Sequence, residues 1–380
     1  MINGLYCIEA GKAAVVIDGQ FGSTGKGSIA ALIGMTEHTD VAVTNAAPNS
    51  GHTAILSDGT VLVTRHLPMA GVVSYRRGHQ ATIYLDAGSV IDADVLIEEC
   101  RTLSVDPGCV FIHPRAALIT TLDKEYENDD ESAATALAST RKGVGRALAL
   151  KVMRESPLAY TGTAIINSEY EEHRLSLCEA GFRFEVLDLN SLLLKGERVL
   201  IEVPQGFDLS LNHGLSYPHC TSRDVTVASA LSDAGVHPKF LGQVVMTTRT
   251  FPIRVGHIVH DGVIAGHSGP HYPDQKELTW DDLPVEGPEL TTVTKRPRRI
   301  FTWSDTQYVN ALRALRPDVV FLNFTNYFKD EAAFDAHVRR MYATQRSERF
   351  EPRHVFGVGP TVDDIVLASH QVTARMGWRS

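Results

Sequence analysis

Long apolar runs, paired cysteines and an excess of positive charge are all missing from this chain of 380 residues. No uninterrupted apolar stretch approaches the roughly 20 residues that a membrane-spanning helix needs. The five cysteines are scattered and form no Cys-x-x-Cys pair, which argues against a zinc site or a disulfide framework. Lys and Arg number 36 against 45 Asp and Glu, a net charge of −9 that disfavours general binding to nucleic acid or membranes. Because a signal-peptide pattern is also absent, we expect a soluble, cytoplasmic protein.

The sequence does contain a regular alternation of apolar, β-branched runs with amphipathic segments. This alternation is typical of an α/β protein in which helices flank a large, mostly parallel central sheet. No linker-like stretch interrupts it, so we expect residues 1–380 to form a single domain. The predicted strands are Ala13–Ile17, Val41–Thr44, Ala81–Leu85, Cys109–Ile112, Val199–Val203, Gln243–Thr247 and Val319–Asn323; the predicted helices are Asp92–Leu103, Ala133–Val152, Thr226–Ala234 and Ser304–Leu315; Asp123–Glu131 and Asp261–Gly287 are predicted loops.

The segment Gly19–Ser28 places four glycines and a lysine between a predicted strand and a helical pattern. Glycines let backbone N–H groups converge on an anion, the helix N-terminus adds positive potential, and Lys26 adds a point charge. The segment therefore predicts a cradle for a nucleoside triphosphate. It departs from the ordinary P-loop, because Gln20 stands where the first glycine belongs and Gly27 replaces the hydroxyl residue.

Three further clusters each allow an ordinary and a functional interpretation. His52, in the cluster Asn45–Thr53, is either a loop histidine or a proton donor beside a phosphate group. The run Thr292–Arg299 is either a solvated charged face or a stiff loop whose guanidinium groups capture carboxylates or phosphate. Gln205, at the end of a predicted strand, belongs either to a polar turn or to an amide contact with a base or phosphate.

Taken together and in this order, the clusters resemble the motifs of adenylosuccinate synthetases. The matching segments span nearly the whole chain and are Gly19–Ser28, Asn49–Thr53, His66–Gly71, Thr140–Gly145, Gln205-Gly206, Thr292–Arg299 and Gly359-Pro360. The resemblance implies the fold of that family and a C–N ligase activity. In this reaction a triphosphate phosphorylates O6 of a purine nucleotide, and the amine of L-aspartate then displaces that phosphate from C6.

Two departures from the family pattern indicate the substrates. The loop carboxylate that serves the family as general base toward purine N1 and as magnesium ligand is replaced by Ser23, and the adjacent glutamate by Thr24. Serine is neutral and smaller, so it leaves room for a substituent at purine C2. The guanine-reading Thr-Lys-x-Asp motif is replaced by Asn323–Asn326, and an asparagine amide can pair with adenine. The chain therefore most resembles a phage branch of the family, which uses dGMP, L-aspartate and ATP (or dATP) to make the diaminopurine precursor N6-succino-2-amino-2′-deoxyadenylate.

The resemblance implies roles residue by residue. Catalysis falls to Ser23, Lys26 and His52, and Mg²⁺ is the implied cofactor, contacted by Ser23 and Gly51. The donor nucleotide is held by Gly22, Thr24, Gly25, Lys26, Gly27 and Thr53, and near its base by Asn326, Gly357, Gly359 and Pro360. The acceptor nucleotide is held by Ser23, Asn49, Thr140, Gln205 and Thr221, and L-aspartate by Thr294, Arg296 and Arg298. Arg154 is implied to reach the neighbouring active site of a homodimer.

Two alternatives stay open. An ordinary adenylosuccinate synthetase would act on IMP with GTP, and a catalytically inactive relative would only bind nucleotides. Ser23 and Asn326 argue against the first, whereas the presence of Lys26, His52 and the run Arg296–Arg299 argues against the second. A phage-encoded enzyme of this kind would work in the host cytoplasm.

Overall fold

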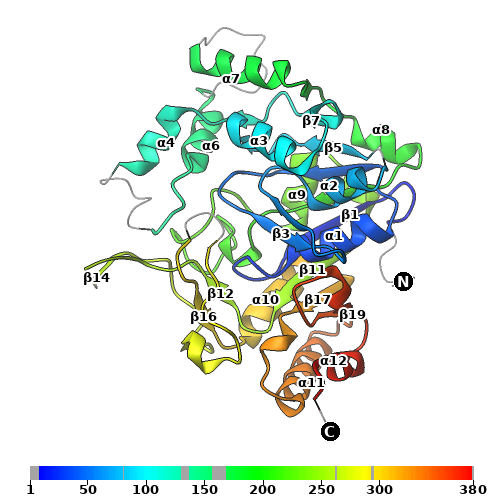
Figure 1. Cartoon of the computed structure of the whole chain (residues 1–380), viewed down its shortest axis with the longest axis vertical. Helices are drawn as coiled ribbons and strands as arrows, with labels where there is room; N and C mark the ends of the chain where they lie inside the picture. Colours follow the sequence, from blue (N-terminus) through cyan, green and yellow to red (C-terminus); the bar gives the residue numbers. More distant parts are fainter. Residues whose placement is uncertain are drawn as a thin grey trace.

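A ten-stranded sheet forms the centre of the molecule (Figure 1). The computed structural model describes residues 8–79, 81–129, 137–155, 168–261, 263–291 and 295–378. The strands follow the order β19-β18-β17-β11-β1-β10-β2-β5-β7-β9, and all neighbours in it run parallel except β18 and the edge strand β19. The predicted α/β class with a mostly parallel central sheet is therefore confirmed.

The elements have the following bounds. The central sheet contains β1 (Ala13–Asp18), β2 (Val41–Thr44), β5 (Thr82–Leu85), β7 (Val110–Ile112), β9 (Arg183–Phe184), β10 (Val199–Glu202), β11 (Leu241–Arg249), β17 (Val319–Asn323), β18 (Arg353–Gly357) and β19 (Ile365–Val366). Smaller sheets pair β3 (His52–Ile55) with β4 (Val61–Thr64), β6 (Val90–Ile91) with β8 (Ala117–Leu118), β13 (Ile258–His260) with β14 (Val263–Gly266), and β16 (Arg299–Phe301) with both β12 (Ile253–Arg254) and β15 (Glu277–Leu278). The α-helices are α1 (Lys26–Thr36), α2 (Met69–Arg76), α3 (Ala93–Leu103), α4 (Thr121–Asn128), α6 (Val144–Met153), α7 (Ser168–Glu179), α8 (Leu189–Leu194), α9 (Val227–Ala234), α10 (Asp305–Leu315), α11 (Glu331–Ser347) and α12 (Ser369–Met376).

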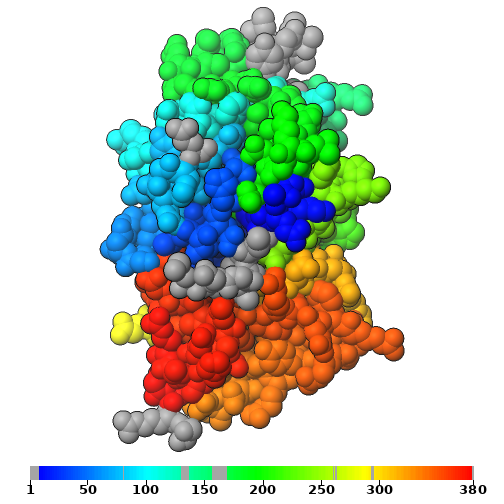
Figure 2. Space-filling view, turned by 90° about the vertical axis from the view of Figure 1, so that its right-hand side faces the viewer, coloured from blue at the N-terminus to red at the C-terminus, as the bar shows by residue number. Residues whose placement is uncertain are grey.

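The sheet is buried on both faces, which is why its strands are continuously apolar. Successive side chains of a strand point to opposite faces. In β1, Ala14 and Val16 join a core with α1, α2, α3 and α7, whereas Ala13, Val15 and Ile17 join a second core with α8 to α12. Figure 2 shows the C-terminal segments, orange and red, gathered at one end of the molecule and α7, green, at the other.

All seven predicted strands are present, with ends shifted by two residues or fewer. Three predictions were wrong in part. The predicted loop Asp261–Gly287 contains the short strands β14 and β15. The acidic stretch from Asp123 is not a loop up to residue 128 but lies in α4, which begins behind a capping box formed by Thr120 and Asp123. The predicted helix 133–152 is not continuous: among its described residues, 137–143 are not helical, Arg141 and Gly143 have φ of 52° and 80°, and α6 begins at Val144. Residues 133–136 lie outside the described part. None of the helices in the described ranges has the length and apolar character needed to cross a bilayer.

Candidate active site

The glycine-rich segment between β1 and α1 turns sharply at the carboxyl edge of the sheet. Gly22, Ser23 and Gly25 have φ of 95°, 55° and 91°, and α1 begins directly afterwards at Lys26. A Cβ atom on Gly25 would come within 2.0 Å of the Asn323 side-chain nitrogen, so this position requires glycine. The free N–H groups at the start of α1 face the segment with positive partial charge, which suits an anion. The predicted phosphate loop therefore has the expected strand–loop–helix form.

Asp18, the last residue of β1, binds several groups of this loop through its carboxylate, a role that was not predicted from the sequence. Its fully buried carboxylate accepts the N–H groups of Gln20 at 2.8 Å and Gly22 at 3.3 Å. The second oxygen accepts the hydroxyl of Thr24 and pairs with Lys26 Nζ at 3.1 Å. The available signal was a carboxylate that ends an otherwise apolar strand directly before the glycines.

A cavity of about 370 Å³ opens beside the loop. Most of the predicted site residues line it: Gly22, Ser23, Thr24, Gly25, Lys26, Gly27, Asn49, Gly51, His52, Thr53, Thr140, Gln205, Arg298, Gly359 and Pro360. The predicted residues Arg154, Thr221, Arg296, Asn326 and Gly357 are described but do not line it, and Thr294 lies outside the described residues.

Three of these five residues do not line the cavity themselves but lie against a residue that does. The Thr221 N–H donates to the carbonyl of Leu209, which lines the cavity, at 2.7 Å. The backbone N–H of Arg296 donates to the hydroxyl of Thr291, which lines the cavity, at 2.9 Å. A Cβ atom on Gly357 would come within 1.9 Å of the Asn323 side chain, so this glycine makes room for a lining residue.

The other two lie elsewhere. Asn326 is half-buried in the 3-10 turn Thr325–Tyr327, whereas Asn323 and Phe324 just before it line the cavity. Arg154 is exposed and caps the C-terminus of α6. The roles of both residues remain predictions.

His52 begins β3 at the edge of the cavity and is half-buried. Burial and, secondly, the charge of Lys26 lower the pKa of His52 to about 3. The imidazole is therefore neutral at physiological pH, where it can donate one N–H hydrogen bond to a ligand but carries no second proton.

Gln205 contacts both the phosphate loop and Asn49, another residue that lines the cavity. Its backbone has a φ of 70°, in the left-handed region. Its carbonyl accepts Lys26 Nζ at 2.7 Å, and its amide donates to the side chain of Asn49 at 3.2 Å. The predicted acceptor-side residues Gln205 and Asn49 are thus in contact with each other, and Gln205 also contacts the phosphate-loop lysine.

A buried arginine, Arg249, contacts three residues that line the cavity: Ser23, Glu289 and Phe324. It ends β11, has no solvent exposure, and its guanidinium lies 3.9 Å from the ring centre of Phe324. One nitrogen donates to the Ser23 carbonyl at 3.1 Å, and two nitrogens pair with Glu289 at 3.1 and 2.5 Å. Glu289 also accepts the Tyr327 hydroxyl at 2.7 Å. None of these contacts was predicted, because Arg249 and Glu289 are 40 residues apart in the sequence.

Backbone hydrogen bonds join the described residues on either side of the arginine-rich run. The backbone N–H of Thr291 donates to the Arg296 carbonyl at 2.9 Å, and the N–H of Arg298 donates to the Glu289 carbonyl at 2.9 Å. Arg298 lines the cavity, and although burial lowers its pKa to about 10, it remains a cation at neutral pH. The loop therefore presents a positive charge to the same cavity as the phosphate loop.

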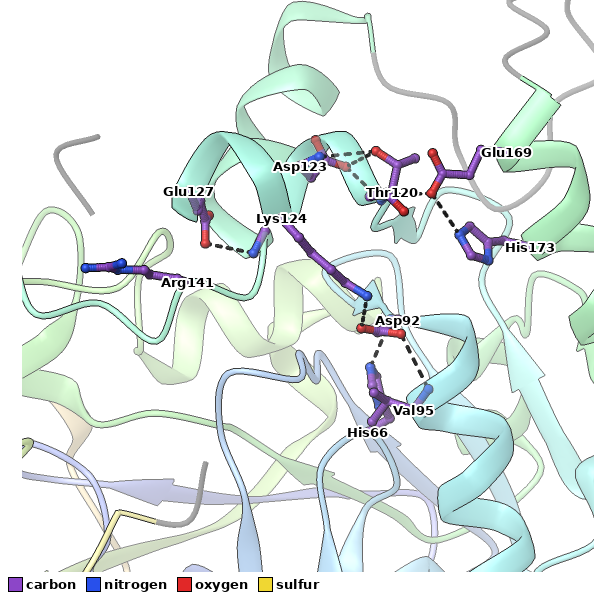
Figure 3. Close-up of polar contacts among 12 residues, drawn as sticks. His66, Asp92, Val95, Thr120, Asp123, Lys124, Glu127, Arg141, Glu169 and His173 are labelled. Carbon is purple, nitrogen blue, oxygen red and sulfur yellow. Dashed lines mark hydrogen bonds and ion pairs between the residues drawn. The ribbon is translucent and has the colours of Figure 1, made fainter. Parts of the chain in front are cut away.

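Helices α4 and α6 hold Thr140 at the cavity. The carboxylate of Glu127, at the end of α4, accepts N–H groups at the start of α6, including that of Gly143 at 2.7 Å. Figure 3 shows Lys124 extending from α4 to Asp92, with which it pairs at 2.8 Å. A carboxylate at a helix N-terminus is stabilising there, so α4 fixes the start of α6 and the turn that carries Thr140.

His66, which begins the segment His66–Gly71, is part of the core and not of the cavity. It is fully buried, and its Nε2 accepts the Asp92 N–H at 3.2 Å (Figure 3). The carboxylate of Glu99 accepts the N–H groups of residues 65, 66 and 67, each at 2.9 Å. This segment therefore supports the fold under the site.

A magnesium ion would find few protein ligands here. In the part of the chain that the structure describes, no group of three or more His, Cys, Asp or Glu side chains could hold a metal. The predicted contacts Ser23 and Gly51 both line the cavity. Mg²⁺ usually keeps several waters and binds through substrate phosphates with one or two protein groups. The donor set therefore fits an ion that arrives with a nucleotide.

Comparison with known proteins identifies relatives of this chain. A sequence model of the family described as adenylosuccinate synthetase matches residues 15–176 and 167–316. The N6-succino-2-amino-2′-deoxyadenylate synthase of Salmonella phage PMBT28 is 39% identical over 375 residues, which cover 94% of this chain and 97% of that protein. The adenylosuccinate synthetase of Pyrococcus horikoshii is 28% identical over 297 residues, 77% of each chain.

A solved structure extends this similarity to three dimensions. The succinoaminodeoxyadenylate synthetase (PurZ) of cyanophage S-2L, bound to dGMP and to dATP as an energy donor, matches with a TM-score of 0.78 at 34% identity. The match covers 96% of this chain and 99% of that one. With its phosphate loop, its arginine loop and these relatives, the chain belongs to the adenylosuccinate synthetase family of ligases.

Proposed function

We propose that this chain joins L-aspartate to C6 of dGMP with ATP or dATP as phosphoryl donor. The products are N6-succino-2-amino-2′-deoxyadenylate, phosphate and the diphosphate of the donor. Ser23 carries the proposal: it lines the cavity at the turn of the phosphate loop, and its side chain is small and neutral. Such a side chain leaves room for the 2-amino group that distinguishes a guanine from a hypoxanthine. The higher identity to phage synthases of this kind than to an adenylosuccinate synthetase supports the same choice.

Different residues around the cavity bind different parts of the substrates. The start of α1 and Lys26 hold the donor phosphates, whose negative charge suits a helix N-terminus and an ammonium group. His52, whose lowered pKa keeps it neutral at physiological pH, donates a hydrogen bond to the oxygens of the phosphoryl group during its transfer. When bound, Mg²⁺ would be held at Ser23 and Gly51 and would neutralise charge on the transferring phosphoryl group.

The acceptor and the amino acid use the other walls. Thr140, Gln205 and Asn49 hold the acceptor nucleotide, with Thr221 behind them, and Arg298, Arg296 and Thr294 hold the carboxylates of L-aspartate. Asn326 and the turn Gly357–Pro360 frame the donor base. The exposed Arg154 reaches the phosphate of the acceptor in the neighbouring subunit of a homodimer, and residues 1–380 act as one domain in the host cytoplasm.

A substrate matrix tests the proposal. The purified protein is assayed for phosphate release with dGMP, GMP or IMP against ATP, dATP or GTP, with and without L-aspartate. We expect phosphate release to require both dGMP and L-aspartate, and ATP or dATP to exceed GTP as donor. Preference for IMP with GTP would instead identify an ordinary adenylosuccinate synthetase, and no release with any combination would identify a binding protein.

A further inference from the structure

Glu289 is the one carboxylate among the described residues that line the cavity. The remaining charged lining groups, Lys26 and Arg298, are cations, and His52 is neutral. The Glu289 side chain is 26% exposed, whereas its partner Arg249 has no exposure. An anionic group is therefore accessible to a ligand in a cavity whose other charges attract anions.

The surroundings of Glu289 hold this carboxylate fixed and ionised. Arg249 binds both of its oxygens, and Tyr327 donates to one of them. Although burial pushes the pKa of Glu289 upward, the Arg249 charge and hydrogen bonds outweigh it, so the pKa is lowered overall. Each carboxylate oxygen has two lone pairs, so these contacts leave acceptor capacity for a ligand.

Glu289 is also joined directly to the arginine loop. Its backbone carbonyl accepts the N–H of Arg298, and Leu290 pairs with Pro297 in an isolated bridge. On the other side, the Arg249 nitrogen that contacts Glu289 also contacts the Ser23 carbonyl. The carboxylate thus lies between the loop proposed to bind the amino acid and the residue proposed to face the acceptor purine.

The chemistry of an amino acid ligand fits this arrangement. L-aspartate carries two carboxylates and one ammonium group, and each charge needs a partner of opposite sign when water is excluded. We infer that Glu289 binds the α-ammonium group of L-aspartate while Arg298 binds its carboxylates. This inference rests on the proposed function for the amino acid substrate and is independent of which nucleotide accepts it.

Comparison of L-aspartate with succinate tests the inference, because succinate keeps both carboxylates and lacks the ammonium group. In Glu289→Gln we expect the KM for L-aspartate to rise by about tenfold or more, since a charge-assisted contact is lost. The competitive inhibition constant of succinate should change by less than about threefold, as should the KM values of both nucleotides. Glu286→Gln removes the same charge from an exposed position on the same segment, and it should leave all of these constants unchanged.

The other outcomes overturn the inference. Equal weakening of L-aspartate and succinate would mean that Glu289 only supports the arginine loop, and an increase confined to the KM of dGMP would place it at the acceptor instead. If Glu289→Gln does not fold, Tyr327→Phe removes one donor to the carboxylate while the Arg249 pair stays. That variant should raise the KM for L-aspartate by about two- to fivefold without affecting succinate, and equal or absent effects contradict the inference.

If the wild-type enzyme uses IMP and not dGMP, the proposed acceptor is wrong, but the comparison of L-aspartate with succinate is still made with IMP.

Discussion

At the scale of single residues, the role proposed for Ser23 is to set both the charge and the space beside the acceptor purine. In Ser23→Asp we expect kcat/KM for dGMP to fall by about tenfold or more, because a larger, charged side chain crowds the 2-amino group. The ratio of IMP to dGMP turnover should rise. Steady-state kinetics with both acceptors measure this, and Ser23→Ala, which adds no bulk or charge, should keep the preference for dGMP. Unchanged kinetics of Ser23→Asp with both acceptors would contradict the role given to Ser23.

Asp86, which follows β5, makes a different prediction at this scale, because its burial links stability to pH. Its side chain is 1% exposed, and one of its oxygens has no hydrogen-bond partner among the described residues. Burial and, secondly, the charge of Asp233 raise the pKa of Asp86 to about 8. Between the ordinary carboxyl pKa near 4 and about pH 8 the folded state therefore binds more protons than the unfolded state. The contribution of Asp86 to the unfolding free energy of the protein must therefore fall as pH rises through this window, because the folded state has to lose the proton on Asp86.

Asp86→Asn removes that titration. We expect the unfolding free energy of the variant, relative to wild type, to rise by on the order of 4 kcal/mol from pH 5 to pH 8, at about 1.4 kcal/mol per pH unit. Urea unfolding at several pH values measures the difference, and the exposed Asp281→Asn serves as control. A difference that stays constant with pH would show that Asp86 is ionised throughout.

At the scale of elements, the contact between α4 and α6 carries a prediction about the acceptor site. Glu127→Ala leaves the N–H groups of Gly143, Gly145 and Arg146 without their acceptor. We expect a loss of about 1–3 kcal/mol in unfolding free energy and a higher KM for the acceptor nucleotide, because the turn that carries Thr140 loosens. Glu125→Ala, exposed on the same helix, should change neither. An unchanged KM in a destabilised Glu127→Ala would mean that α6 does not position Thr140.

The sequence predicts an element well when the interactions that form it involve residues close together in the chain, and poorly when they depend on tertiary contacts. Seven of the ten strands of the central sheet were predicted because they are buried on both faces and form continuous apolar runs, whereas β9, β18 and β19 were not predicted. Helix α4 was missed because its acidic composition resembles a loop, although Thr120 and Asp123 form a local capping box. The motif residues of the phosphate loop were found, but Asp18 was not, since a single carboxylate at a strand end has no pattern of its own. The pair of Arg249 and Glu289 depends on tertiary contact, and no spacing rule predicts it.

At the scale of the whole molecule, the sheet explains how motifs far apart in the chain form one cavity. Parallel strands place their carboxyl ends at one edge, where ligands of open α/β sheets bind. The segments after β1, β2, β10, β17 and β18 all contribute to the lining. Gly25 and Asn323 are nearly 300 residues apart and yet pack too closely for a Cβ atom on the glycine. The central sheet therefore brings the phosphate loop and the segments proposed to bind the acceptor and the donor base to one cavity of the chain.

Arg154 is one of the predicted site residues that do not line the cavity, and it is exposed at the end of α6. If a partner subunit's copy completes each site, Arg154→Ala and Lys26→Ala should each be nearly inactive alone. In an equal mixture allowed to exchange subunits, about a quarter of wild-type activity should return, because half of the dimers are hybrids with one intact site. Sedimentation of each variant as a dimer is the control. Dimers that recover no activity on mixing would place Arg154 in its own subunit's site, and a monomeric wild type would remove the need for a partner, since the cavity would then have to bind both nucleotides with the residues of one chain.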